Sequence, residues 1–100
     1  MYVYVWEYQV HATAAAEFIR HYGADGTWVA LFRQADGYLG TELLRDRDAP
    51  NRFMTIDRWR DEAAFASFRG QFAEPFEALD RRCAALTAME TPRGHFHVVD

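Results

Sequence analysis

The sequence predicts an α+β domain whose elements follow one another in the order strand, helix, strand, strand, helix, strand. Two stretches, 2–10 and 52–59, alternate with the two-residue period of a strand. Two longer stretches repeat apolar residues at the three- and four-residue spacing of helices, and turn-forming Gly, Pro and Asp residues separate the segments. This order is the ferredoxin-like plan, with a four-stranded antiparallel sheet and helices on one face. With 100 residues, we expect one domain spanning 1–100.

Residues 2–37 contain one strand and two short helical segments. Residues 2–10 are rich in valine and aromatic residues and are apolar on both faces, which predicts the first strand. Thr13 is the expected N-cap of a helix whose apolar stripe includes Phe18. A second helical segment covers about 28–35, and Gly37 is expected to end it.

The chain from residue 38 onward contains the remaining three strands. Residues 38–46 read as the second strand and 52–59 as the third, with a turn between them. Asp61 is a good N-cap for the next helix, and Pro75 suits the first turn of a further one. A proline and a glycine then break the pattern, so the last strand is predicted to be short, over 95–99.

The third strand has two different faces, and both carry apolar side chains. Met54 and Ile56 point to one side. The opposite side carries Phe53, Thr55, Asp57 and Trp59. Helices of the same chain can cover only one face of such a sheet, so the other face needs a second molecule. We therefore expect a homodimer packed through the open sheet face.

Composition excludes several classes of protein. The net charge of −4 argues against nucleic-acid binding, which needs concentrated positive charge. No apolar run approaches the ~20 residues that cross a bilayer, so no membrane association is expected. The lone Cys83 excludes an intrachain disulfide and fits a reducing compartment, and its place in a helical apolar pattern predicts a core position. Because the N-terminus also lacks signal-peptide features, the predicted location is the cytoplasm.

Four segments, which together cover nearly the whole chain, carry a resemblance to a known family. They are the first strand, Gly26-Thr-Trp-Val-Ala-Leu-Phe-Arg33, Asp36-Gly-Tyr-Leu-Gly-Thr-Glu-Leu-Leu-Arg-Asp46, and Phe53 to Phe68, where a strand ends in Trp59 just before an acidic helix start. In these segments the chain resembles the antibiotic biosynthesis monooxygenase (ABM) domain family. The family consists of small dimeric α/β-barrel proteins, among them cofactor-independent oxygenases of aromatic polyketides and haem-degrading monooxygenases.

The resemblance implies a cofactor-independent monooxygenase-like protein that acts on, or binds, a small aromatic or quinonoid molecule. In the polyketide oxygenases an Asn, a Trp and a Tyr serve substrate binding and proton handling. The Trp matches Trp59, but the Asn falls on Thr55 and the Tyr on Phe65. Thr55 can still exchange a hydrogen bond, whereas Phe65 has no proton to give. The alternative of a non-catalytic ligand-binding or stress-related dimer therefore stays open, and with it whether the protein is an enzyme.

The haem-degrading branch is a poor match. Its haem ligand is a His on the last long helix, and the expected helix over 75–89 contains none. Its helical Trp falls on Phe68. We therefore expect no haem and no other cofactor.

The expected site combines three catalytic candidates with an aromatic wall. The catalytic candidates are Trp59, Thr55 and Asp57. The ligand-pocket candidates are Tyr8, Trp28, Phe53, Phe65 and Phe68. These aromatics either line a pocket or simply fill the core. Asp57 is either a buried base with a raised pKa or the partner of a rim arginine, one of Arg33, Arg58 and Arg60.

The histidines give only a weak signal. His95 and His97 lie two apart on one face of a strand, which suits a metal only if a third ligand comes from elsewhere. No metal-binding motif accompanies them, so we expect no metal site. His11 and His21 flank the first helix, either as proton shuttles at the pocket mouth or in surface and capping roles.

Overall fold

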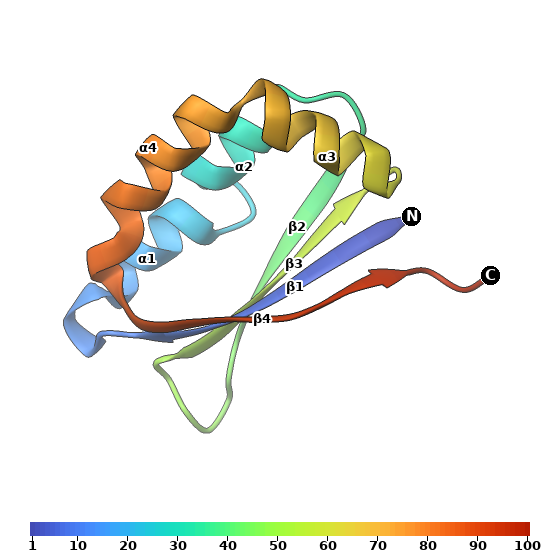
Figure 1. Cartoon of the computed structure of the whole chain (residues 1–100). Helices are drawn as coiled ribbons and strands as arrows, with labels where there is room; N and C mark the ends of the chain where they lie inside the picture. Colours follow the sequence, from blue (N-terminus) through green and yellow to red (C-terminus); the bar gives the residue numbers. More distant parts are fainter.

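The computed structural model describes all residues, 1–100, and has the expected α+β architecture (Figure 1). The elements are β1 (Tyr2–Val10), α1 (Ala15–Tyr22), α2 (Thr27–Phe32), β2 (Tyr38–Arg45), β3 (Arg52–Trp59), α3 (Glu62–Gln71), α4 (Ala73–Cys83) and β4 (Thr87–His97). The four strands form one antiparallel sheet in the order β2-β3-β1-β4. All four helices lie on one side of the sheet and leave the other side bare (Figure 1). The ferredoxin-like prediction is confirmed.

The register between β1 and β3 decides which side chains meet on the helix side of the sheet. Tyr4 lies opposite Asp57, and Trp6 lies opposite Thr55. Because residues directly opposite each other in an antiparallel pair share a face, an aromatic row on β1 runs beside the polar residues of β3. The predicted division of β3 into two faces is confirmed.

The core fills the space between this face and the helices. Its most completely buried large side chains come from distant parts of the chain: Tyr2, Phe18, Phe53, Trp59 and Phe68. Cys83 is also fully buried, as its helical pattern predicted. These side chains join the helices to the sheet, because each removes a large apolar area from water.

Two of the three predictions about helix starts are confirmed, and one is wrong. The Asp61 carboxylate accepts a hydrogen bond from the Ala64 backbone N–H at 2.8 Å and caps α3. Pro75 lies in the first turn of α4, where a missing N–H costs no helical hydrogen bond. Thr13 does not cap α1, which begins at Ala15 without any side-chain cap. A 3₁₀ turn over 12–14 places Thr13 inside a helical turn, where it lacks the extended backbone of a cap.

The prediction of a short last strand is wrong. β4 begins at Thr87, and α4 ends at Cys83, before the expected helix end. Pro92 and Gly94 lie inside the strand rather than before it, at a shift in register against β1. Because β4 is an edge strand, a proline there disturbs only one ladder of hydrogen bonds, and a bulge accommodates it.

α2 ends at Phe32, before the expected helix end, so the prediction that Gly37 ends this helix is wrong. Gly37 lies instead in the turn between α2 and β2. Its φ of +90° lies in the region that favours glycine, and a Cβ would lie 2.6 Å from the Ala64 Cβ. Its carbonyl accepts a hydrogen bond from the Arg60 N–H at 2.7 Å. Gly37 therefore ties the start of β2 to the end of β3, next to the start of α3.

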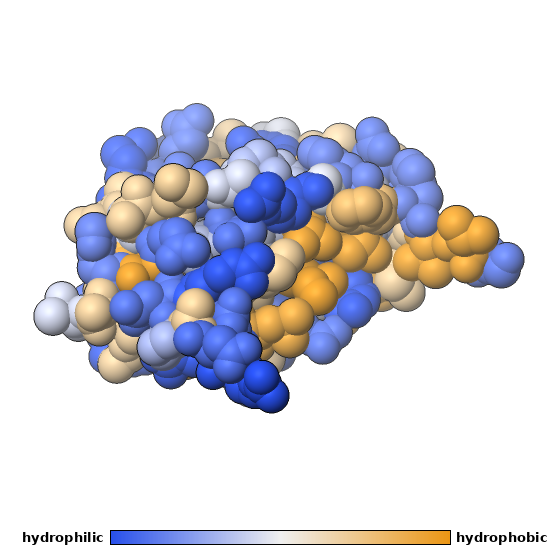
Figure 2. All heavy atoms as spheres, turned by 90° about the horizontal axis from the view of Figure 1, so that it is seen from below, coloured by the Kyte–Doolittle hydropathy of each residue, from blue (hydrophilic) through white to orange (hydrophobic).

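The face of the sheet without helices carries a hydrophobic patch, which Figure 2 shows beside hydrophilic side chains. The hydrophobic side chains on this face are Val3, Val5, Leu44, Met54, Ile56, Met89 and Phe96. Leu44, Met89 and Phe96 are 44%, 59% and 50% exposed, respectively, so this face leaves large apolar side chains open to solvent. The hydrophilic part consists of ion pairs, such as the one between Arg58 and Glu42. None of the helices has the length and apolar character needed to cross a membrane.

Candidate functional site

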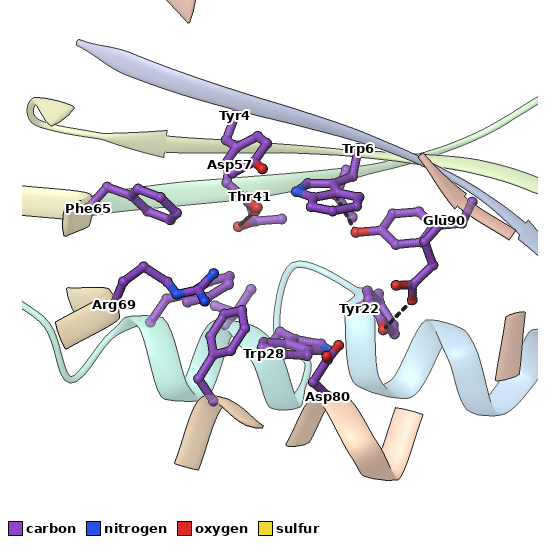
Figure 3. Close-up of a pocket in the computed structure, with 15 residues that line it drawn as sticks. Tyr4, Trp6, Tyr22, Trp28, Thr41, Asp57, Phe65, Arg69, Asp80 and Glu90 are labelled. Carbon is purple, nitrogen blue, oxygen red and sulfur yellow. Dashed lines mark hydrogen bonds between the residues drawn. The ribbon is translucent and has the colours of Figure 1, made fainter. Parts of the chain in front are cut away.

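A cavity of about 280 Å³ lies between the sheet and the helix layer (Figure 3). Every strand and every helix contributes at least one side chain to its wall. The lining residues are Tyr4, Trp6, Tyr8, Tyr22, Trp28, Val29, Phe32, Thr41, Thr55, Asp57, Phe65, Arg69, Phe76, Asp80 and Glu90. Such a cavity, mostly apolar with a few polar groups, is typical of a site for a small organic molecule.

Aromatic rings form two opposing walls of the cavity. On the sheet side, the Trp6 ring lies 5.5 Å from the Tyr4 ring and is stacked on the Tyr8 ring at 6.5 Å. On the helix side, Trp28 and Phe76 meet edge to face with ring centroids 5.0 Å apart. In Figure 3 the space between Trp6 and Trp28 is open. A planar aromatic molecule is the shape that such walls accommodate best.

Asp57 presents its carboxylate to the cavity from β3 (Figure 3). One carboxylate oxygen accepts a hydrogen bond from the Thr41 hydroxyl at 2.6 Å. The Thr41 oxygen in turn accepts from the Tyr38 hydroxyl, 2.7 Å away, because its own proton goes to Asp57. The second carboxylate oxygen has no partner within the chain, so it is available to a bound molecule.

No arginine pairs with Asp57, so the rim-pairing alternative is wrong. The three candidate arginines have other partners, namely Asp25 for Arg33, Glu42 for Arg58, and Asp36 with Asp61 for Arg60. The geometric reason is that Arg58 and Asp57 are neighbours on a strand and point to opposite faces.

Burial of the carboxyl group raises the pKa of Asp57 to about 6, and the Thr41 hydrogen bond opposes part of that rise. A carboxylate with this pKa is mainly ionised at neutral pH and is a stronger base than an exposed aspartate. Asp57 is therefore suited to accepting a proton from a bound molecule near neutral pH.

A second polar pair lies deeper in the wall. The Tyr8 hydroxyl and the Thr55 hydroxyl share a hydrogen bond of 3.0 Å, and both residues are buried. Burial raises the pKa of Tyr8 despite this hydrogen bond, so its phenol keeps its proton. The pair can orient a ligand by hydrogen bonding but holds no base.

The model of the family described as antibiotic biosynthesis monooxygenase matches residues 1–82. The chain belongs to this ABM family. Among curated proteins there is no significant match.

Solved structures of similar fold include SnoaB, a cofactor-independent oxygenase from Streptomyces nogalater. It is 25% identical, the match covers 99% of this chain and 93% of SnoaB, and the TM-score is 0.71. The TM-score with an asparagine-to-alanine variant of SnoaB is 0.75 at the same identity and coverage. PA3566 from Pseudomonas aeruginosa has a TM-score of 0.71 at 22% identity, over 99% of this chain and 94% of that one. The likeness to PA3566 shows the fold alone.

Five of the eight residues singled out in the sequence line the cavity of this ABM chain. They are Tyr8, Trp28, Thr55, Asp57 and Phe65. Phe53, Trp59 and Phe68 do not line it, because they are buried in the core. Trp59 lies one layer behind the wall, with its ring 5.5 Å from that of Phe65, and its indole N–H has no hydrogen-bond partner.

The cavity of the ABM domain also has wall residues that the sequence reading missed. Tyr4 and Trp6 could have been found, because they alternate with Tyr8 on the same face of β1. Arg69 follows Phe65 by one helical turn and so shares its face of α3. The position of Thr41 opposite Asp57 could not be found from the sequence, because it depends on a register shift near Gly40.

The histidines of the ABM chain lie outside the cavity. The His95 ring packs against the Tyr4 ring in a tilted arrangement, with ring centroids 4.0 Å apart, and is hydrogen-bonded to the Tyr2 hydroxyl. His97 lies 3.7 Å from Glu62. His21 is hydrogen-bonded to Thr27 at 2.9 Å. No three His, Cys, Asp or Glu side chains are grouped so that they could hold one metal ion.

The raised pKa of Asp57 predicts that the contribution of this group to the stability of the ABM protein falls as the pH rises. Between the ordinary aspartate value of 3.8 and about 6, the folded chain binds more protons at Asp57 than the unfolded chain does. The free energy of unfolding therefore falls through this window, by roughly 3 kcal/mol from this group. We expect the Asp57→Asn variant to lack this decrease in the free energy of unfolding. The measurement is urea unfolding at pH 4 and at pH 7, at one fixed protein concentration.

Asp25→Asn is the matched control, since it removes a surface carboxylate that is 91% exposed. This variant should keep the pH dependence of the unsubstituted protein. An unchanged pH dependence in Asp57→Asn would contradict a buried, proton-binding Asp57.

Proposed function

We propose that the protein is a homodimeric, cofactor-independent monooxygenase-like enzyme that oxidises a small aromatic or quinonoid molecule in this cavity. The observation that carries the proposal is the Asp57 carboxylate, held by Thr41 between two aromatic walls. The similarity to SnoaB, a cofactor-independent oxygenase, supports the class of reaction.

Such a reaction needs a substrate that can itself reduce dioxygen. Anthrone, whose ring CH₂ group becomes a carbonyl, serves as the example. Asp57 accepts a proton from this carbon, and the resulting carbanion passes one electron to O₂. The two radicals combine to form a C–O bond, and the proton held by Asp57 converts the peroxide anion into a hydroperoxide.

The second half of the reaction forms the carbonyl. Asp57 removes the remaining proton from the same carbon, the O–O bond breaks, and hydroxide leaves. The hydroxide takes the proton from Asp57 and becomes water. One oxygen atom ends in the product and the other in water, and all four electrons come from the substrate, so no external reductant is required.

The other site residues take supporting roles in this proposal. Thr41 holds the Asp57 carboxylate, and the Tyr8–Thr55 pair offers a hydrogen bond to a substrate oxygen. The aromatic walls stack against the substrate and exclude water. Trp59 acts as a positioning residue, because it supports Phe65 from behind.

The homodimer forms through the open face of the sheet. The support is the exposure of Leu44, Met89 and Phe96 on a face that no helix covers. Large apolar patches of this kind mark interaction surfaces, and a two-fold dimer is the commonest closed arrangement. A cytoplasmic location fits the single, unpaired Cys83.

A second candidate is a non-catalytic ligand-binding dimer of the same fold. Phe65 favours it, since this residue lines the cavity where the resemblance places a proton-transferring tyrosine. In this case the cavity binds the aromatic molecule and Asp57 only hydrogen-bonds it.

The experiment that separates the two candidates measures oxygen consumption by the metal-free protein with anthrones, naphthols and hydroquinones, against protein-free autoxidation. We expect protein-dependent uptake of one O₂ per anthrone, without peroxide accumulation. Binding of the same compounds without uptake would favour the ligand-binding dimer. Neither uptake nor binding would overturn both candidates.

A further inference from the structure

Charge is distributed unevenly along the cavity. Its wall contains three carboxylates but only one cationic side chain, Arg69 of α3. In Figure 3, Arg69 lies at the end of the cavity next to Phe65, while Asp80 and Glu90 lie at the opposite end and Asp57 between them. A ligand therefore meets a positive group at one end and negative groups at the other.

Arg69 has no partner of its own. Its guanidinium lies over the Phe76 ring, 3.9 Å from the centroid, and donates no hydrogen bond and forms no ion pair within the chain. Arg52, in contrast, is paired with both Glu7 and Asp46. Stacking on Phe76 restricts the guanidinium plane and leaves its N–H edge free to bind a planar anion in a bidentate manner.

The opposite end of the cavity repels anions. The Tyr22 hydroxyl donates to the Glu90 carboxylate at 3.5 Å, and no arginine or lysine neutralises either Glu90 or Asp80. The pKa of Glu90 is raised by partial burial of its carboxyl group and further by the charge of Asp80. An anionic substituent is thus attracted to one end and disfavoured at the other, which fixes the orientation of an asymmetric ligand.

We propose that Arg69 is a specificity-determining residue that selects planar aromatic ligands carrying a carboxylate and orients this carboxylate toward α3. This inference rests on the proposed function, since it concerns the ligand of the same cavity. Arginine suits the role better than lysine, because its fork matches the two oxygens of a carboxylate.

The test compares 2-naphthoic acid with 2-naphthamide, two probes of the same shape that differ in charge. Binding is followed by quenching of tryptophan fluorescence, since Trp6 and Trp28 line the cavity, and by calorimetry. We expect the acid to bind about five-fold more tightly than the amide, as for an ion pair that water still reaches. The preference should weaken at high salt, because screening acts on exposed charges.

Arg69→Gln should abolish the preference for the acid, and Arg69→Lys should retain part of it. Arg81→Gln is the matched control, since it removes an exposed arginine of α4 that lies outside the cavity wall. This control should keep the full preference of the unsubstituted protein.

Three results would overturn the proposal. The first is equal binding of acid and amide to the unsubstituted protein, and the second is a preference for the acid that survives in Arg69→Gln. Either result would reject the role of Arg69 but leave the proposed oxygenase function untouched, since the amide still binds. Binding of neither probe would also reject the proposed role of Arg69. In that case, oxygen uptake with neutral anthrone tests the proposed oxygenase function separately.

Discussion

Replacing Ile56 by aspartate is expected to dissociate the proposed homodimer or to unfold the chain. Ile56 lies on the open face of the sheet, directly opposite Val5 on β1 and Glu42 on β2. In a sheet-to-sheet dimer this position is enclosed, and a carboxylate there is left without a cationic partner. A buried charge without a partner costs about 3–5 kcal/mol, which is a large part of the stability of a small domain.

The measurement is size-exclusion chromatography with light scattering at micromolar concentration. The unsubstituted protein should elute near twice the 11.6 kDa mass of one chain. The Ile56→Asp variant should elute near the mass of a single chain or as an unfolded chain. Ile19→Asp is the matched control, because Ile19 is 39% exposed on α1 in the helix layer. A monomeric unsubstituted protein, or an Ile56→Asp variant that remains a dimer, would contradict the proposed interface.

The sequence predicted the fold well where periodicity and local capping determine it. The bounds of β3 and the cap at Asp61 match the structure, because alternation and a side-chain hydrogen bond are local properties. The last strand was mispredicted because Pro92 and Gly94 read as breakers. Their tolerance depends on β4 being an edge strand, which is a property of the whole sheet.

The site was predictable only in part, for a similar reason. Alternation on β3 correctly placed Thr55 and Asp57 on the helix side. The same alternation also selected Phe53 and Trp59, which belong to the core, because period alone does not tell how far along a strand the cavity extends. The hydrogen bond to the Asp57 carboxylate comes from Thr41, and this contact depends on the register of another strand, β2.

Replacing Asp57 by asparagine is expected to lower the rate of oxygen uptake by about 10²- to 10⁴-fold, the usual contribution of a general base. Asparagine has nearly the same shape and keeps an oxygen that can accept the Thr41 hydrogen bond, but it cannot take up the proton of the substrate. Binding of 2-naphthamide should change little, which separates loss of chemistry from loss of the cavity.

The pH dependence of the rate gives a second, independent readout of the same role. Since the base must be ionised, kcat/KM of the unsubstituted protein should rise with pH and reach half its maximum near the Asp57 pKa of about 6. Thr41→Val removes the hydrogen bond that lowers this pKa, so the midpoint should move to higher pH. Uptake by Asp57→Asn within about three-fold of the unsubstituted rate, with the same pH profile, would show that another group or the solvent accepts the proton.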